Sequence, residues 1–399
     1  MSSSTITRRT LLARSLSGVG VGWIGKLLPA GSSSVAFSAL AQPISNPGET
    51  AEATRSERAG MSNVAQAFMQ QYDVPGLSVA IGHAGTLVYE GAFGWADREK
   101  REAVSPSHLF RIASVSKPIT SVAVFSLLEA GHIHLSDRIF GRGAILGTDY
   151  GGPPYHPQVD EITVGHLLTH TSGGWSNNPP DPMHMNLEMN HAQLIKWTLR
   201  HQPLDHPPGQ NYAYSNFGYC VLGRVIEKIT RQPYAVYVGN TVLKRCGISD
   251  TAISGNTLAQ RRRGEVMYYG QGENPYGMNV ARMDSCGGWI ARPADLVQFL
   301  MHVSGFDNPP NILKPETLQT MTTASVANTR YAKGWWENRV NNWWHSGGLP
   351  GTATVVVRTH SGFCWAAFAN TLRRNSPMVL DLSDKLVWNM ISQVKSWRV

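Results

Sequence analysis

A serine and a lysine three positions apart are the first residues in this chain whose types and spacing suggest chemistry. Ser114 and Lys117 form an S-x-x-K pattern at the start of an apolar stretch. In a helix this spacing places the hydroxyl and the amine on one face, one turn apart. Burial can lower the pKa of a lysine amine enough for the neutral amine to act as the base for the serine. The alternative is an exposed lysine that follows a helix-capping serine.

The same S-x-x-K pattern recurs at Ser392 and Lys395, on what we expect to be a solvated terminal helix. The pattern alone therefore does not identify a nucleophile. Position favours Ser114, because a serine that opens a hydrophobic helix has a backbone N–H free of intrahelical bonds. Its hydroxyl can then lie at a junction between two lobes.

A second motif follows about a hundred residues later. Tyr214 and Asn216 form the single Y-x-N pattern of the chain, directly before a predicted helix. A phenol can relay a proton between a nucleophile and a leaving group, and a carboxamide can both donate to a substrate carbonyl and hold a lysine. The alternative is a tyrosine packed in the core and an asparagine that only caps the helix.

A third motif consists of His345, Ser346 and Gly347, which lead into Gly348 and a predicted strand. Backbone N–H groups on a strand that faces the serine can bind an oxyanion, and glycine permits a close approach of the substrate. The letters H-S-G recur at residues 360–362. That copy lies in a tight turn between two predicted strands, so we select residues 345–347.

Together and in this order, the three motifs resemble the active-site set of the β-lactamase and penicillin-binding-protein superfamily of serine hydrolases. The segments at 109–114, 167–173 and 285–299 resemble the family's approach to its serine, its signature helix end and its return to the sheet. The resemblance covers roughly residues 57–394.

The resemblance implies a role for each motif residue. Ser114 attacks an acyl carbonyl, and Lys117 and Tyr214 handle its proton. The full implied set is Ser114, Lys117 and Tyr214 for catalysis, Asn216, His345, Ser346 and Gly347 for substrate binding, and the backbone N–H groups of Ser114 and Gly348 for the oxyanion hole.

The departures from the family pattern narrow the expected chemistry. Y-x-N in place of S-D-N, with no obvious separate glutamate for deacylation, resembles the class C side of the superfamily. Histidine where lysine is usual resembles soluble DD-peptidases, D-aminopeptidases and carboxylesterases of this fold. We therefore expect an exported hydrolase that cleaves an ester or amide through an acyl-enzyme. The alternatives are a β-lactamase, or a penicillin-binding sensor that is acylated without turnover.

The sequence patterns of the helices and strands that must position these residues predict an α+β fold. Apolar patterns predict strands that join in one antiparallel sheet, flanked by an N-terminal helix over 61–69 and a C-terminal helix over 377–394. A mostly α-helical lobe, roughly residues 118–285, is inserted into this α/β lobe. The predicted strands are 77–81, 87–93, 343–346, 352–358 and 363–369.

The first 41 residues are typical of an export leader. Arg8 and Arg9 precede a mildly apolar stretch, and a small-x-small pattern ends at Ala41. We expect a twin-arginine signal peptide at 1–41, a linker at 42–56 and the hydrolase domain at 57–399, with a periplasmic or extracellular location. Lys26 limits the uncharged run to residues 15–25, short of the ~20 residues that a membrane span needs. The alternatives are a cytoplasmic amphipathic start and an uncleaved anchor.

Charge and composition exclude a nucleic-acid-binding protein. The formal net charge is +8, and four of the basic residues lie in the leader, which leaves +4 scattered over the rest of the chain. A small-molecule or peptide substrate is the expected partner, and the sequence does not indicate an oligomeric state.

Four cysteines could form two disulfides in three pairings, but we favour buried free thiols because two of the four lie in strongly apolar segments. A cluster of Met and His at 183–191 would suit copper, yet irregular loop packing is the favoured interpretation. We expect no metal and no cofactor. The cysteines are Cys220, Cys246, Cys286 and Cys364.

Overall fold

One seven-stranded sheet carries the elements that position the candidate site. The computed structural model describes residues 53–397, so the predicted leader 1–41 and linker residues 42–52 lie outside the described residues. The strands of this sheet are β1 (Gly76–His83), β2 (Thr86–Asp97), β3 (Glu102–Ala103), β8 (Trp336–Glu337), β9 (Trp343–Leu349), β10 (Thr352–Arg358) and β11 (Phe363–Ala369). Their order is β3-β2-β1-β11-β10-β9-β8.

The sheet joins the two ends of the described chain. β1 pairs with β2 in a hairpin and with β11 on its other edge, and β10 pairs with both β11 and β9. Each of these pairs is antiparallel, as is the pairing of β9 with β8. The predicted α+β fold, with early and late strands in one antiparallel sheet, is confirmed.

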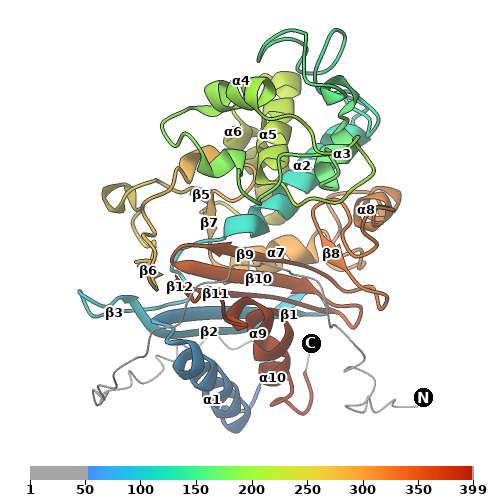
Figure 1. Ribbon diagram of the computed structural model, residues 1–399. Coiled ribbons are helices and arrows are strands. Elements are labelled where there is room, and N and C mark those ends of the chain that lie inside the picture. Colours follow the sequence, from blue (N-terminus) through green and yellow to red (C-terminus); the bar gives the residue numbers. More distant parts are fainter. Residues whose placement is uncertain (1–52, 398–399) are drawn as a thin grey trace. The chain divides into compact units, whose positions relative to one another are not determined.

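The two terminal helical regions cover one face of the sheet (Figure 1). They are α1 (Arg55–Tyr72) at the N-terminal side, and α9 (Met378–Asp381) and α10 (Val387–Ile391) at the C-terminal side. Met61, Phe68 and Met378 from these helices share one core with the sheet residues Val79 and Val355. A capping box formed by Thr54 and Glu57 starts α1, two residues inside the segment 42–56 that we expected to be a linker.

The C-terminal helix differs from the continuous helix predicted over 377–394. A π-helical segment, Leu382–Leu386, separates α9 from α10. Met378, Leu382, Leu386 and Met390 recur at intervals of four and are all buried, a spacing that drifts around a helix of 3.6 residues per turn. The wider π turn offsets this drift and returns the later residues to the sheet.

The opposite face of the sheet carries α7 (Pro293–Met301) and the helical lobe (Figure 1). One core cluster runs from Val356 and Phe368 of the sheet, through Leu296 of α7, to helices of the lobe. This arrangement agrees with a helical lobe inserted between the early and late strands. The lobe contains α2 (Ser116–Glu129), α3 (Val164–Leu168), α4 (His191–His201), α5 (Asn216–Thr230) and α6 (Tyr234–Val238), and α8 (Pro315–Thr322) follows it.

Short segments complete the structure around the lobe. A three-stranded sheet pairs β4 (Phe110–Arg111), β7 (Trp289–Ala291) and β5 (Ala252–Ile253), and β12 (Thr371–Leu372) pairs with β6 (Tyr269–Gly270). The short helical turns are η1 (Ala113–Val115), η2 (Val159–Glu161), η3 (Pro182–His184), η4 (Gly239–Leu243), η5 (Lys244–Cys246), η6 (Leu258–Gln260) and η7 (Ala281–Met283).

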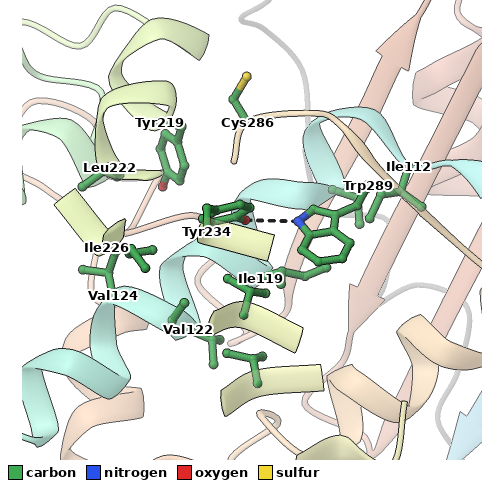
Figure 2. Packing of buried hydrophobic residues seen from close by; sticks show 14 of the residues in the cluster. Ile112, Ile119, Val122, Val124, Tyr219, Leu222, Ile226, Tyr234, Cys286 and Trp289 are labelled. Atoms are coloured by element: carbon green, nitrogen blue, oxygen red, sulfur yellow. Dashed lines mark hydrogen bonds between the residues drawn. The ribbon is translucent and has the colours of Figure 1, made fainter. Parts of the chain in front are cut away.

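The helix α2 is buried nearly all round, as its lack of a polar face predicts. Its neighbours in the lobe core include Ile226 of α5 and Trp289 of β7 (Figure 2). The Trp289 indole Nε1 donates to the Tyr234 hydroxyl at 3.1 Å. Gly131 follows the helix with φ +71°, the left-handed conformation of a glycine that ends a helix. The helix that carries the S-x-x-K lysine is therefore fixed inside a packed core.

All four cysteines are buried free thiols, as predicted. The segment with the Met and His cluster is held by Arg282, whose guanidinium donates to the carbonyl oxygens of Met183, Met185, Asn186 and Met189. Loop packing therefore accounts for this segment. In residues 53–397 no helix is both long and apolar enough to cross a membrane.

Candidate active site

Ser114 lies in the tight turn η1 rather than inside the helix that the apolar pattern predicts from residue 114. The α-helix begins two residues later, at Ser116. The preceding Ala113 is fully buried and has φ +48°, a conformation that costs a non-glycine residue of order 1–3 kcal/mol. Ser114 is half-buried, so this turn leaves the residue partly accessible.

The two residues before this turn are fixed to the sheet by threonine hydroxyls. Thr352 Oγ1 donates to the carbonyl of Arg111 at 2.9 Å, and Thr354 Oγ1 donates to the carbonyl of Ile112 at 2.8 Å. The backbone N–H of Ile112 donates to the carbonyl of Trp289 at 2.9 Å. Residues 111 and 112, which lead into the Ser114 turn, are therefore held in place by hydrogen bonds to β10 and β7.

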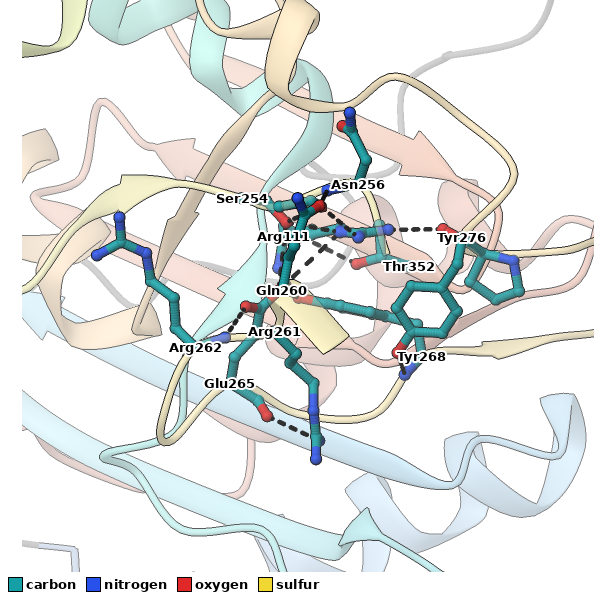
Figure 3. Close-up of polar contacts among 12 residues, drawn as sticks. Arg111, Ser254, Asn256, Gln260, Arg261, Arg262, Glu265, Tyr268, Tyr276 and Thr352 are labelled. Atoms are coloured by element: carbon teal, nitrogen blue, oxygen red, sulfur yellow. Dashed lines mark hydrogen bonds and ion pairs between the residues drawn. The ribbon is translucent and has the colours of Figure 1, made fainter. Parts of the chain in front are cut away.

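The Arg111 side chain holds the same segment in place through further contacts (Figure 3). Its guanidinium donates to Ser254 Oγ and to the carbonyls of Gly255 and Pro275, at 2.7–2.9 Å. It also lies over the Tyr268 ring, 4.5 Å from the centroid. Burial of an arginine is tolerated here because its donors are satisfied. We did not single out Arg111 from the sequence.

Gly347 of β9 packs directly against this turn. A Cβ at this position would lie 2.4 Å from the carbonyl oxygen of Ile112 and 3.0 Å from the Ala113 Cβ. Only glycine allows the strand to come this close. The third motif is thus brought next to Ser114, and the exposed Gly348 follows on the same strand.

Lys117 is completely buried and its amine has three partners. Nζ lies 3.1 Å from Ser114 Oγ, 2.6 Å from Asn216 Oδ1 and 2.8 Å from the carbonyl oxygen of Cys286. The amide oxygen and the carbonyl oxygen can only accept. A neutral amine therefore gives its two hydrogens to these two acceptors, and its lone pair faces the Ser114 hydroxyl.

Burial lowers the pKa of Lys117 to about 8, against weaker opposing effects of Cys286 and Asp181. The Cys286 thiol is itself buried, which raises its pKa and keeps it uncharged at neutral pH. With a pKa near 8, about one amine in ten is neutral at pH 7, compared with fewer than one in a thousand for an exposed lysine. Lys117 therefore meets the requirement for a base.

Tyr214 contacts both the serine and the lysine. Its hydroxyl shares a side-chain hydrogen bond with Ser114, and the Lys117 Nζ lies 4.7 Å from the centroid of its ring. Burial raises the pKa of this phenol well above its usual value, although the Ser114 bond opposes the shift. The phenol is therefore neutral near pH 7, and it suits proton donation or relay rather than a standing negative charge.

The Y-x-N motif is held by contacts of its backbone and of its middle residue. Ser215, not Asn216, caps α5, and its hydroxyl accepts from the N–H of Gly218 at 2.9 Å. The N–H of Asn216 donates to Asn177 Oδ1 at 2.7 Å. This frees the Asn216 side chain to accept from Lys117, so the capping alternative for Asn216 does not apply.

His345 is placed differently from the substrate contact that the family resemblance implies. Its side chain is only 1% exposed. Nε2 lies 3.2 Å from the Tyr331 hydroxyl, and Nδ1 lies 2.7 Å from the carbonyl oxygen of Ser346. Both ring nitrogens are thus occupied by protein atoms. Within residues 345–348, His345 and Gly347 are buried, Ser346 is half-buried and Gly348 is exposed.

The duplicate motifs lie away from this cluster. His360 lies in the turn between β10 and β11, as predicted, and bonds Asn342. Ser392 and Lys395 are exposed beyond α10, and the Ser392 hydroxyl donates to the carbonyl of Asn389. The structure thus brings together Ser114, Lys117, Tyr214 and Asn216, with β9 beside them.

Other residues of the site could not be identified from local patterns. Tyr331 contacts His345 from a loop before β8, and the carbonyl of Cys286 accepts from Lys117. Tyr331 lies in no motif, and Cys286 lies in the segment 285–299 without any local sign that its carbonyl holds the lysine, because both residues act through pairings between distant parts of the chain. Within residues 53–397, no three His, Cys, Asp or Glu side chains are arranged to hold a metal ion.

Comparison with known proteins yields one family. The family model described as Beta-lactamase matches residues 61–385. Protein flp of Staphylococcus aureus (strain NCTC 8325 / PS 47) is 26% identical over 299 residues, which are 72% of this chain and 58% of that protein. Penicillin-binding protein 4* of Bacillus subtilis (strain 168) is 24% identical over 313 residues, 70% of this chain and 64% of that one. The chain thus spans less than two thirds of these curated relatives.

Solved structures share the fold. D-amino acid amidase from Ochrobactrum anthropi SV3, complexed with L-phenylalanine amide, superimposes with a TM-score of 0.68 at 21% identity, over 84% of this chain and 99% of that one. The octameric penicillin-binding protein homologue from Pyrococcus abyssi gives a TM-score of 0.67 at 21% identity, over 84% and 79%. At these identities the likeness establishes the fold alone.

Proposed function

The chain belongs to the β-lactamase family, and from this premise we propose that it is a serine hydrolase that forms an acyl-enzyme on Ser114. The observation that carries the proposal is the environment of the Lys117 amine. Two obligatory acceptors, Asn216 Oδ1 and the Cys286 carbonyl, direct its lone pair toward the serine. Burial lowers the pKa of this amine to about 8, within the range where a base works near neutral pH.

The proposed reaction has two stages. Ser114 Oγ attacks the carbonyl carbon of the substrate while its proton moves to the Lys117 amine, and the carbonyl oxygen becomes an oxyanion. Collapse of this intermediate breaks the ester or amide bond, and the neutral Tyr214 phenol passes a proton to the leaving group. The protonated Lys117 amine then returns a proton to Tyr214. Water attacks the acyl-serine carbonyl and gives a proton to the Lys117–Tyr214 pair. Collapse breaks the bond to Ser114 Oγ, which takes this proton back, and the carboxylic acid product leaves.

Backbone donors of Ser114 and Gly348 are the proposed oxyanion hole. The supporting geometry is the packing of Gly347 against Ile112 and Ala113, which brings β9 to the Ser114 turn. Asn216 and Ser346 flank the same point and are proposed to contact the substrate. A preorganised oxyanion donor is typically worth ~10²–10³ in rate.

The substrate that we propose is an ester, or an amide of a D-amino acid. A structural neighbour is a D-amino acid amidase and a curated relative is a penicillin-binding protein. The name of the amidase supports acyl transfer from amides of D-amino acids. Hydrolysis of a β-lactam, or acylation without turnover, is the second candidate function, because the family model that matches the chain is described as Beta-lactamase.

A panel of chromogenic substrates tests these candidates. The purified protein is assayed with p-nitrophenyl esters, D-amino-acid p-nitroanilides and nitrocefin, each in stopped flow and at steady state. The proposal predicts steady turnover of the esters or D-amides that exceeds nitrocefin turnover. A burst of one equivalent with no later release would instead support a sensor, and no burst and no turnover across the panel would contradict the proposal.

We further propose that residues 1–41 direct twin-arginine export of a chain that is folded before transport. Arg8 and Arg9 and the small-x-small pattern before Ala41 support this proposal. Conversion of Arg8 and Arg9 to lysine should keep the protein in the cytoplasmic fraction of a host with this export system. Equal export of the variant and the parent would contradict it.

A further inference from the structure

A continuous hydrogen-bonded chain of buried groups connects the Y-x-N loop to the H-S-G strand. The backbone N–H of Ser215 donates to His170 Nδ1 at 3.1 Å. His170 Nε2 lies 3.0 Å from the Tyr331 hydroxyl, which lies 3.2 Å from His345 Nε2. His345 Nδ1 lies 2.7 Å from the carbonyl oxygen of Ser346. Tyr331 is thus the link between two of the three motifs around the serine.

The partners at the two ends fix the direction of every hydrogen in this chain. His170 Nδ1 accepts from an N–H, so the hydrogen of the neutral ring is on Nε2 and is donated to the Tyr331 oxygen. The Ser346 carbonyl can only accept, so the hydrogen of His345 is on Nδ1 and Nε2 needs a donor. The Tyr331 hydroxyl is the donor within hydrogen-bond distance of this nitrogen. The same hydroxyl also bonds Tyr219, whose own hydrogen goes to the Leu168 carbonyl. One phenol therefore sets the tautomers of both histidines.

Both histidines are held neutral. Burial, reinforced by the nearby Lys117 and opposed by the bond to the Ser346 carbonyl, lowers the pKa of His345 to about 3. Burial also places the pKa of His170 well below its usual value, with Lys117 and His345 adding to the effect. Each ring therefore has one donor and one acceptor, and the chain has no alternative charged form near neutral pH.

The loop that carries Tyr331 is fixed to α2, the helix that carries Lys117. Ser121 Oγ of α2 donates to the carbonyl of Lys333 at 2.5 Å. Gly334 has φ +91°, and a Cβ there would lie 2.7 Å from the Ser121 Cβ. Tyr331 itself is fully buried, so it acts through its neighbours rather than on the substrate.

We propose that Tyr331 is a positioning residue for the acyl-transfer site. Its hydroxyl connects the Y-x-N loop to the H-S-G strand and so fixes the position of these two motifs relative to each other around Ser114. The role of His345 is then to transmit this positioning to the Ser346 carbonyl rather than to bind the substrate. This inference rests on the proposed function of the site. It assigns a task to three buried groups that the acyl-transfer steps do not use.

A second tyrosine in the same aromatic cluster provides the matched control. The Tyr212 ring lies 5.6 Å from that of Tyr331 and 5.9 Å from that of His170. Its hydroxyl is buried but has no hydrogen-bond partner among residues 53–397. Tyr212→Phe therefore removes a hydroxyl from the same cluster without breaking the chain, whereas Tyr331→Phe leaves His170 without an acceptor and His345 without a donor.

The first test compares the steady-state kinetics of the two variants with the substrate that the wild-type protein turns over best. Tyr331→Phe should lower kcat by about 10–100-fold with KM changed less than about threefold, because small misplacements of reacting groups mainly affect the chemical step. Tyr212→Phe should change kcat by less than about twofold. Equal kcat values for both variants and the wild type would overturn the positioning role.

The second test reads the histidine tautomers directly and does not depend on activity. Two-bond ¹⁵N–¹H spectra of histidine-labelled protein should show one ring with its hydrogen on Nδ1 and one with it on Nε2, assigned by His345→Gln and His170→Gln. Tyr331→Phe should alter both signals, and Tyr212→Phe neither. Unaltered tautomers in Tyr331→Phe would overturn the inference even if its kcat falls.

Two further outcomes separate this inference from the proposed function. His170→Phe breaks the chain at its other link, so the double variant with Tyr331→Phe should lose no more kcat than the worse single variant. If the kcat losses of the two single variants added fully in the double variant, His170 and Tyr331 would not act through one hydrogen-bonded series. A wild-type protein without turnover of any substrate would overturn the proposed function and the catalytic meaning of Tyr331, whereas normal turnover in Tyr331→Phe would overturn this inference alone.

Discussion

The two S-x-x-K segments of this chain have the same motif letters and opposite environments. Lys117 is completely buried and bonds Ser114, Asn216 and a backbone carbonyl. Lys395 is exposed, and the hydroxyl of Ser392 donates only to a carbonyl of its own helix. The difference teaches that the chemistry belongs to the acceptors and the burial around the amine, not to the three-residue spacing.

The two H-S-G segments differ in the same way. Gly347 has its would-be Cβ position filled by Ile112 and Thr354, at 2.4 Å from an atom of each. Gly362 lies in a hairpin turn with φ +90°, and nothing lies within 3.8 Å of its would-be Cβ. The first glycine permits contact between two elements, and the second only permits a turn.

The largest expected contrast is between the two serines. Ser114→Ala removes the nucleophile and should lower kcat/KM by at least about 10⁴-fold, since residues of a nucleophile set act as one unit. Ser392→Ala removes an exposed hydroxyl and should leave kcat/KM unchanged. Steady-state assays of both variants make the comparison, and a Ser114→Ala protein that keeps a tenth of its turnover would refute the assignment.

The two lysines should differ by somewhat less. Lys117→Met keeps the volume of the buried stem and removes the base, so kcat should fall about 10²–10⁴-fold. Lys395→Met should have no measurable effect on kcat. Because Asn216 and the Cys286 carbonyl lose their donor in Lys117→Met, thermal unfolding is recorded alongside the kinetics. Equal kcat for the two variants would show that Lys117 is not the base.

The pH dependence of kcat/KM should report the burial of Lys117. The amine acts as a base only when it is neutral, and burial lowers its pKa to about 8. The rate should therefore rise with pH up to about 8, with a gain of about 50-fold between pH 6 and pH 8. Lys395→Met should give the same profile. A profile that is flat from pH 6 to pH 9 would contradict a lysine base.

The smallest expected contrast is between the two glycines. Gly347→Ala pushes β9 away from the Ser114 turn, which should cost about 1–3 kcal/mol of unfolding free energy and about tenfold in kcat. Gly362→Ala makes only ordinary van der Waals contacts, the nearest at 3.9 Å, and its left-handed conformation costs about 1–2 kcal/mol without an effect on kcat. Urea unfolding and kinetics together distinguish them. A larger kcat loss in Gly362→Ala would reverse the comparison.

Much of the fold followed from local patterns. The strands over 352–358 and 363–369 have the bounds that apolar periodicity and turn residues indicate. The sequence could not reveal the π turn at Leu382–Leu386 or the exact start of α2. These depend on how helices fit the sheet, which is set by packing between distant segments.

The candidate site was predictable only in part. Spacing, order and family resemblance brought Ser114, Lys117, Tyr214 and Asn216 to attention, and the structure brings them together. No local signal indicated that His345 is buried, or that Tyr331 joins it to His170. Such roles arise from tertiary hydrogen bonds, which leave no periodic pattern in a single sequence.

Covalent labelling tests the central claim most directly. The protein is treated with a fluorophosphonate, and its intact mass and tryptic peptides are measured for the wild type, Ser114→Ala and Ser392→Ala. Trypsin places the two serines in separate peptides, residues 112–138 and 386–395. We predict one equivalent of label, on Ser114, in the wild type and in Ser392→Ala, and none in Ser114→Ala. Label that persists in Ser114→Ala, or an unlabelled wild type, would contradict the account.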